Sequence, residues 1–170
     1  MKISIKFIAS LYVLLFLLGC QRKNESVSVK FNEKNGSLLN HFSYKIPNST
    51  EFDSVSISFF DNGHIDKIQY FKKQSLNGES LSFYKNGQLF ELTRYVKGKH
   101  NGRFYSFYKS GVKASELIYE DGINVGYGLE YFDSTAVQRV LALYNNEGKA
   151  YYVLINDSLG NVISEKGNRK

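Results

Sequence analysis

The chain has 170 residues, which favours one domain, and its aromatic residues are 13 Tyr and 13 Phe with no Trp. A formal net charge of +6, scattered along the chain, is typical of a solvated surface rather than a nucleic-acid site. One Pro and 14 Gly beside so many aromatic residues are typical of β-strands joined by tight turns.

The first 19 residues are predicted to be a signal segment outside the fold. Lys2 and Lys6 precede an apolar run over 7–19, which is too short to span a bilayer comfortably but has the length of a secretory signal core. The only cysteine, Cys20, follows at once, and the stretch LLGC over 17–20 resembles the lipobox of bacterial lipoproteins. An ordinary signal or anchor helix, with Cys20 a chance buried residue, is the alternative.

The lipobox resemblance implies that Cys20 carries a diacylglycerol after cleavage of the signal, and that its new amine is acylated. Each buried methylene contributes about 0.8 kcal/mol, so two or three acyl chains would hold the protein durably on a bacterial cell membrane. Gln21 stands where Asp would favour retention at the inner membrane, so the outer membrane is favoured if the cell is Gram-negative. Residues 20–29 are polar and are predicted to form a tether.

A 24-residue repeat follows the tether. LSFYKNG over 81–87 returns as YSFYKSG over 105–111, and the columns keep this period over four units. Periods of this size indicate a repeat architecture. The aromatic pairs of the repeat stand at Phe59-Phe60, Phe83-Tyr84, Phe107-Tyr108 and Tyr131-Phe132.

Each unit is predicted to be a β-hairpin. Asn62-Gly63 is the strongest short signal for a type I′ turn, which needs positive φ at both central residues. Longer glycine-containing turns are expected over 97–102 and 120–126. Alternation in the first strand places Ile57, Leu81, Tyr105 and Leu129 on a core face, and Ser58, Ser82, Ser106 and Glu130 on the other.

The second strand of each hairpin leaves two registers open, one burying Phe90 and Leu92 and the other Leu89 and Tyr95. Residues 30–53 are expected to form an irregular first unit, 151–163 a closing strand, and 166–170 a disordered tail. The prediction is therefore an all-β fold: an elongated antiparallel meander of about five β-hairpin repeats over 30–165, with only neighbouring units in contact.

The units resemble MORN repeats, in particular the bacterial variant with a tyrosine-rich strand, an Asn-Gly turn and a closing Gly-Lys-x-x-Gly turn. The likeness is carried by NGESLSFYKNGQLFELTRYVKGKHNG over 77–102, holds over 55–126, and weakens over 30–54 and 127–163, where Thr135 replaces the turn glycine. The resemblance implies a hairpin-repeat platform for binding or structure. Some bacterial members are described as antitoxins, which would fit an immunity role at the envelope.

No catalytic constellation is visible in the sequence, and no enzyme activity or cofactor is expected. His41, His64 and His100 have no partner ligands at metal-binding spacing, so no metal site is expected. The glycines end hairpins rather than opening a helix as a phosphate-binding loop would.

One column suggests a binding surface: Phe60, Tyr84, Tyr108 and Phe132 are expected to form an aromatic ladder opposite the core face. The competing interpretation is that they only stabilise neighbouring strands. The leading hypothesis is a membrane-anchored, non-enzymatic repeat protein that presents a β-sheet surface to a protein partner in the envelope. An immunity or antitoxin protein and a glycan- or lipid-binding envelope protein are the alternatives.

Overall fold

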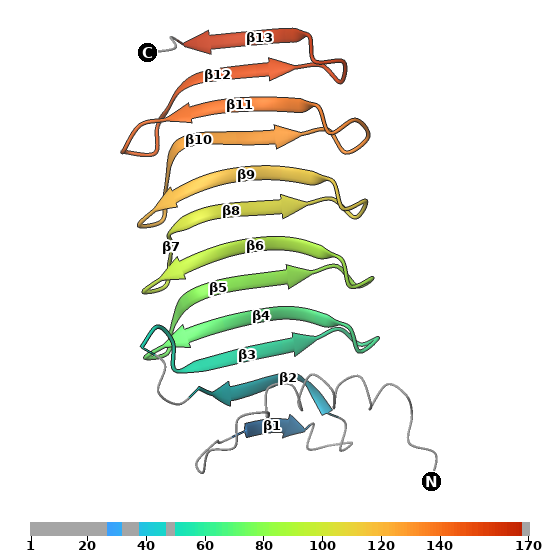
Figure 1. Ribbon diagram of the computed structural model, residues 1–170, viewed down its shortest axis with the longest axis vertical. Coiled ribbons are helices and arrows are strands. Elements are labelled where there is room, and N and C mark those ends of the chain that lie inside the picture. The colour runs from blue at the N-terminus through green and yellow to red at the C-terminus, as the bar shows by residue number, and fades with distance from the viewer. Residues whose placement is uncertain (1–26, 32–37, 47–49, 168–170) are drawn as a thin grey trace.

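The protein is a single antiparallel sheet whose strands follow one another in chain order (Figure 1). The computed structural model describes residues 27–31, 38–46 and 50–167, and in these ranges the regular elements are all β-strands. The predicted all-β meander is confirmed. The thirteen strands are β1 (Val27–Phe31), β2 (Leu38–Lys45), β3 (Ser54–Phe59), β4 (Ile65–Lys72), β5 (Ser75–Phe83), β6 (Leu89–Val96), β7 (Lys99–His100), β8 (Gly102–Phe107), β9 (Lys113–Glu120), β10 (Ile123–Tyr131), β11 (Gln138–Tyr144), β12 (Ala150–Asn156) and β13 (Val162–Gly167).

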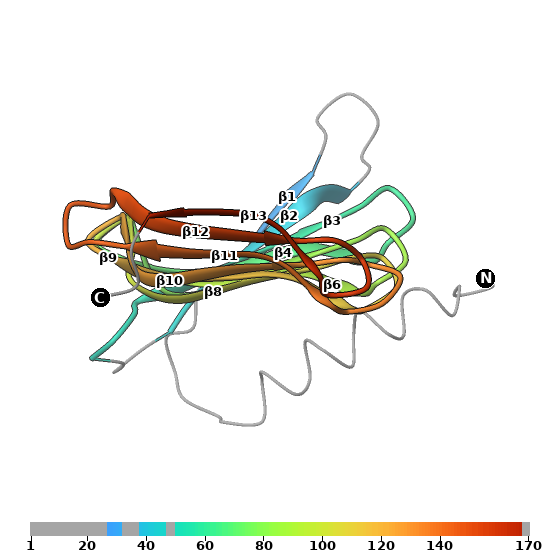
Figure 2. The ribbon, with the colours of Figure 1, turned by 90° about the horizontal axis from the view of Figure 1, so that it is seen from above.

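The sheet is one layer thick. Seen along its long axis, the strands overlap in a thin twisted band, and no second layer of described elements covers either side (Figure 2). Strong burial is consequently rare among the apolar side chains of the described residues, and most are only half-buried. Among the described residues, the buried apolar side chains are those of Val55, Ile57, Val125, Ala142, Tyr152 and Leu154, and Tyr152 is the most deeply buried at 1% exposed.

The two sides of the sheet differ as the alternation predicts. The strand pairing places Ile57 opposite Ile68, Leu81 opposite Leu92, and Leu129 opposite Leu141 on one side, which we call the apolar face. Cross-strand partners share a face, and neighbouring residues along a strand lie on opposite faces. The other side is the hydroxyl face, and it carries Ser58, Ser82, Ser106 and Glu130.

The Asn-Gly turns differ from the predicted type. In the first, the N–H of Gly63 donates to the carbonyl of Phe60 at 2.9 Å and the N–H of Phe60 donates to that of His64 at 2.8 Å. Gly63 has φ of 84°, whereas Asn62 is not among the residues with positive φ. This is a type I turn followed by a left-handed glycine, the three-residue hairpin loop, rather than a type I′ turn.

The three-residue loop has one residue more than a type I′ turn, and this extra residue decides the register of the second strand. The pairing shifts between Ser82 and Phe83, so that Leu89 lies opposite Phe83 and Leu92 opposite Leu81. A bulge at Phe90 therefore puts Leu89 and Leu92 on the apolar face together, and Phe90 is exposed. Neither predicted set holds intact, because the bulge breaks the period of two.

Type I′ turns occur at the opposite edge, where longer turns were predicted. Lys97 and Gly98 have φ of 51° and 80°, and Asp121 and Gly122 have 47° and 87°. Each pair closes a two-residue turn, because Val96 pairs with Lys99 and Glu120 with Ile123. The other residues of the predicted long turns lie in strands or next to them.

The weak repeat after position 127 has a structural cause. The N–H of Ala136 donates to the carbonyl of Phe132 at 2.9 Å, and Ala136 takes the left-handed conformation at φ of 54°. This loop is one residue longer than the three-residue loops, which moves the later columns from a 24- to a 25-residue step. Thr135 therefore does not replace the turn glycine; Ala136 does.

The ends of the fold also differ from the predicted limits. β1 begins at Val27, inside the predicted tether, and β13 runs to Gly167. The predicted closing strand over 151–163 is a hairpin, since β12 and β13 are joined by a turn in which Gly160 N–H donates to the Asp157 carbonyl at 3.1 Å. The predicted signal segment 1–19 and Cys20 lie outside the described residues.

Candidate docking surface

A central row of side chains crosses the whole apolar face. Successive strand pairings bring together one residue from each strand, and most of these are aliphatic. No described layer covers this face, yet its side chains shield one another: Ile57, Glu116 and Leu154 are buried, and the other members of the row are half-buried. A broad, partly exposed apolar surface of this kind is typical of interaction sites. From β3 to β12 the row is Ile57, Ile68, Leu81, Leu92, Tyr105, Glu116, Leu129, Leu141 and Leu154.

Glu116 of β9 interrupts this row with a charge. The residue is only 6% exposed, although its counterparts on neighbouring units are aliphatic. Its carboxylate accepts hydrogen bonds from Lys113 Nζ at 2.8 Å, Tyr127 Oη at 2.8 Å and Arg103 Nη1 at 3.2 Å. A buried carboxylate is costly unless it is paired, and here each oxygen of Glu116 has at least one partner.

The partners of Glu116 hold it in the charged form. The hydrogen bond from Lys113 lowers the pKa of Glu116, against burial, which raises it, and Tyr127 adds a second hydrogen bond. The same contacts act in reverse on the partners. Bonding to Glu116 raises the pKa of Lys113 and the pKa of the Tyr127 hydroxyl, so both stay protonated.

Tyrosine side chains lie next to both cations. Lys113 Nζ lies 5.4 Å from the ring centroid of Tyr105 and 5.6 Å from that of Tyr131, within cation–π distance of both. Arg103 Nη1 also donates to Tyr105 Oη at 3.2 Å. We call Arg103, Tyr105, Lys113, Glu116, Tyr127 and Tyr131 the charged centre.

The charged centre has the composition of a protein-binding hot spot. Tyrosine and arginine dominate the binding energy at protein interfaces, especially where apolar neighbours exclude water. The Arg103 side chain is 60% exposed and that of Lys113 is 38% exposed, so both cations are accessible from solvent. The arrangement can therefore orient a partner by charge while the surrounding aliphatic row contributes contact area.

The predicted aromatic ladder lies elsewhere. Phe60, Tyr84, Tyr108 and Phe132 each follow the last residue of a strand, at the edge formed by the three- and four-residue loops, and all are half-buried. Tyr84 Oη donates to the carbonyl of Phe107, and Tyr108 Oη to that of Tyr131, both at 2.8 Å. These bonds join neighbouring units, as expected from the competing interpretation that the ladder stabilises neighbouring strands.

Cations from the following unit also cover this ladder. Lys85 Nζ lies 5.9 Å from the Phe60 ring centroid, and Lys109 Nζ lies 5.9 Å from that of Tyr84. With one side of the rings occupied by such contacts and the hydroxyls already bonded, the ladder serves cohesion between repeats. Ligand binding by it stays a prediction.

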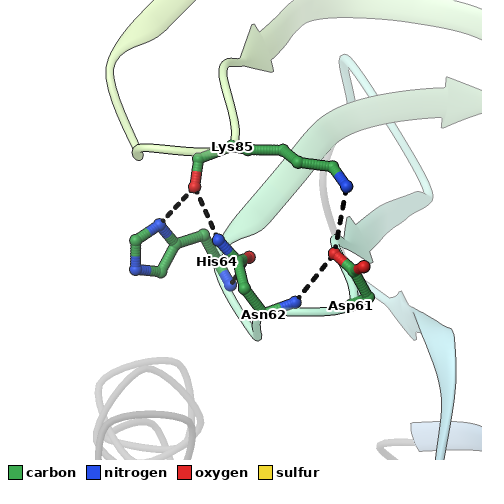
Figure 3. Close-up of polar contacts among 4 residues, drawn as sticks. All are labelled: Asp61, Asn62, His64 and Lys85. Carbon is green, nitrogen blue, oxygen red and sulfur yellow. Dashed lines mark hydrogen bonds and ion pairs between the residues drawn. The ribbon is translucent and has the colours of Figure 1, made fainter.

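The loops at this edge contact one another directly (Figure 3). The carbonyl of Lys85 accepts from Asn62 Nδ2 at 2.7 Å and from His64 Nδ1 at 2.8 Å, and its ammonium pairs with Asp61 at 3.2 Å. Hydrogen bonding and the charge of Lys85 lower the pKa of Asp61. Asp61 and Lys85 are exposed, so their ion pair is expected to matter less than the backbone contacts.

His100 takes part in a side-chain network, unlike the loop position expected from sequence. Its ring lies on the hydroxyl face, with Nδ1 2.9 Å from Thr93 Oγ1 and Nε2 3.0 Å from Tyr95 Oη. In the described part of the chain, no three His, Cys, Asp or Glu side chains gather in a way that could hold a metal ion. Within the same ranges, no helix is long and apolar enough to cross a membrane.

Comparison with protein-family models and with curated proteins found no match to this chain. The resemblances to MORN repeats and to lipoproteins therefore stay predictions.

Proposed function

We propose that this protein is a lipid-anchored, non-enzymatic platform that binds another protein on the apolar face of its sheet, in the bacterial envelope. The observation that supports this most is the partly exposed aliphatic row with the charged centre in its middle. A single-layer sheet that leaves such a surface partly open to solvent gains from a partner that covers it. MORN-like repeats fit the proposal, because stacked hairpins provide a long flat surface.

The partner in this proposal presents apolar side chains around a polar group. Arg103 and Lys113 bring two positive charges and Glu116 brings one negative charge, so the charged centre carries a net charge of +1. A partner carboxylate between apolar side chains would complement it. Charge pairs of this kind favour specificity and correct orientation more than affinity. An immunity role is the narrower version, in which the partner is a toxin that reaches the envelope.

The docking part is tested by quantitative affinity purification from envelopes of the native cell. Leu92→Glu places a charge in the apolar row and is expected to remove any specific partner from the eluate. Ser82→Glu is the matched control, because it adds the same charge on the hydroxyl face of the adjacent strand. Equal recovery of the same proteins with both variants would contradict docking on the apolar face.

The anchoring part is tested separately by labelling cells with radioactive palmitate. We expect the wild-type chain to be labelled and recovered with membranes, and Cys20→Ser to lose the label. A labelled Cys20→Ser variant, or an unlabelled wild-type chain, would refute lipidation at Cys20 while leaving the docking proposal standing.

A further inference from the structure

A second aromatic row lies on the hydroxyl face, near the edge formed by the type I′ turns. It takes Phe71, Tyr95, Tyr119 and Tyr144 from β4, β6, β9 and β11. His100 lies between two of these rings, with its centroid 4.3 Å from that of Tyr95 and 4.9 Å from that of Tyr119. Burial in this stack raises the pKa of Tyr95 and of Tyr119.

Each second-strand aromatic pairs with a residue that follows the next type I′ turn. Leu76 lies opposite Phe71, His100 opposite Tyr95, and Asn124 opposite Tyr119. These residues are 24 apart, and the preceding member of the column is Phe52. Phe52 does not join the row, because its ring packs on Tyr70, on the apolar side, with 4.6 Å between centroids.

The row therefore ends at Phe71 in an open hollow of about 650 Å³. Small residues of β2 and β3, including Ser43, Ser54 and Ser56, line it together with Phe71. A hollow of this volume is within the range that binds small molecules. The row thus presents one aromatic residue, Phe71, to a hollow that is large enough for a sugar ring.

Polar groups of different kinds ring the hollow. Lys45, Asp53 and Lys73 contribute two ammonium groups and one carboxylate, and Gln74 adds an amide. The Asp53 carboxylate accepts from the backbone N–H of Lys73 at 2.7 Å and from Ser54 Oγ at 3.1 Å. These bonds, the one from Lys73 above all, lower the pKa of Asp53, so the carboxylate stays an acceptor at neutral pH.

We propose that this hollow binds a sugar ring, with the C–H face of the sugar on Phe71 and its hydroxyls on Asp53 and the neighbouring serine, lysine and glutamine side chains. A sugar suits the site better than an apolar ligand, because one aromatic residue is set among many hydrogen-bonding groups. A phenolic side chain of a protein partner would use the ring but would offer a single hydroxyl to the polar groups that line the hollow. The site is independent of the docking surface, since it lies on the other face.

The test is saturation-transfer NMR on the full-length protein in a zwitterionic detergent without a sugar headgroup. The probes are glucose, galactose and N-acetylglucosamine at millimolar concentration, with p-cresol as a stand-in for a tyrosine side chain. We expect transfer to the ring protons of at least one sugar. Phe71→Ala is expected to weaken its binding at least tenfold, and Phe90→Ala, which removes an exposed phenylalanine elsewhere, to leave it unchanged.

Ser54→Leu supplies a second variant in case Phe71→Ala disturbs folding. It fills the hollow while leaving the aromatic ring, and it is expected to abolish transfer to the sugar, with an unchanged far-UV circular dichroism spectrum. Transfer to none of the sugars, or transfer that persists in both folded variants, would overturn the proposal. Binding of p-cresol but of no sugar would also overturn it and would indicate a protein side chain as the occupant.

Discussion

Glu116 allows opposite effects on stability to be predicted for two substitutions at one position. Its counterparts on the apolar row, Ile68, Leu92 and Leu141, are aliphatic, so Glu116→Leu restores the repeat. Glu116→Gln instead keeps the shape of the side chain but removes the charge that Lys113 faces at 2.8 Å. The first variant should therefore be tolerated and the second should not.

The expected sizes follow from burial. Hydrogen bonds to a charged group contribute about 1.5–3 kcal/mol to stability. Because the Lys113 side chain is 38% exposed, solvent screens part of this, and we expect Glu116→Gln to lower the free energy of unfolding by about 1–2 kcal/mol. Replacing a buried charge network by apolar side chains is often neutral or stabilising, so Glu116→Leu should change stability by about 0 to +1 kcal/mol.

Urea unfolding of the full-length protein, followed by far-UV circular dichroism and tyrosine fluorescence, measures both values. The result that would refute this reasoning is a loss of stability for Glu116→Leu as large as that for Glu116→Gln. It would mean that the charge network contributes more than the apolar row. If Glu116→Leu is stable but loses the docking partner, the charge is retained for recognition at the expense of stability.

Repeating the urea unfolding at acidic pH gives an independent check. The folded pKa of Glu116 is lowered, so its contribution to stability is present above the unfolded carboxyl pKa and is lost as the pH falls through the folded value. The wild-type protein should therefore lose more stability than Glu116→Leu as the pH is lowered from about 5 to 3. Parallel pH profiles of the two proteins would contradict this account of the charged centre.

Three further substitutions test the cohesion of the repeats, each by urea unfolding. Tyr84→Phe removes the bond to the Phe107 carbonyl and should lower the free energy of unfolding by about 0.5–1.5 kcal/mol, whereas Tyr151→Phe, at an exposed tyrosine, should not; equal losses would contradict this role. Gly63→Ala should lower the free energy of unfolding by about 1–2 kcal/mol, because φ there is 84°, which strains a residue with a Cβ. No atom would touch the added methyl group, so the loss measures backbone strain alone, and no loss would mean that the turn relaxes. Ala136→Gly should raise stability by up to about 1 kcal/mol by relieving the left-handed alanine, and a decrease would refute the strain.

The fold followed from the sequence because its signals repeat. Alternation in the first strand placed Ile57 and Ser58 on opposite faces, and each further unit repeated the same evidence. The turn types were exchanged between the two edges, because Asn-Gly suits a type I′ turn and also a type I turn with a left-handed glycine. The turn type decides whether a bulge forms at Phe90, so the register of the second strand could not be derived before the turn type was known.

The candidate site was harder to predict, because it depends on an exception to the repeat. Ile68, Leu92 and Glu116 stand 24 residues apart and so share a column of the repeat, but only the strand register shows that this column lies on the apolar face. The aromatic ladder was recognised by its period, yet a periodic feature of a repeat protein most often serves the contact between units, as the bond from Tyr84 to the Phe107 carbonyl does. Non-periodic residues on a regular surface are the better guide to recognition here.

Docking on the apolar face is tested most directly by photocrosslinking in living cells. A benzoylphenylalanine residue replaces Leu81, Tyr105 or Leu129 on the apolar face in three separate strains, and Ser106, adjacent to Tyr105 on the hydroxyl face, in a fourth. We predict one discrete crosslinked product from position 105 and none from position 106. The same product from position 106, or no product from positions 81, 105 and 129, would contradict a partner on the apolar face.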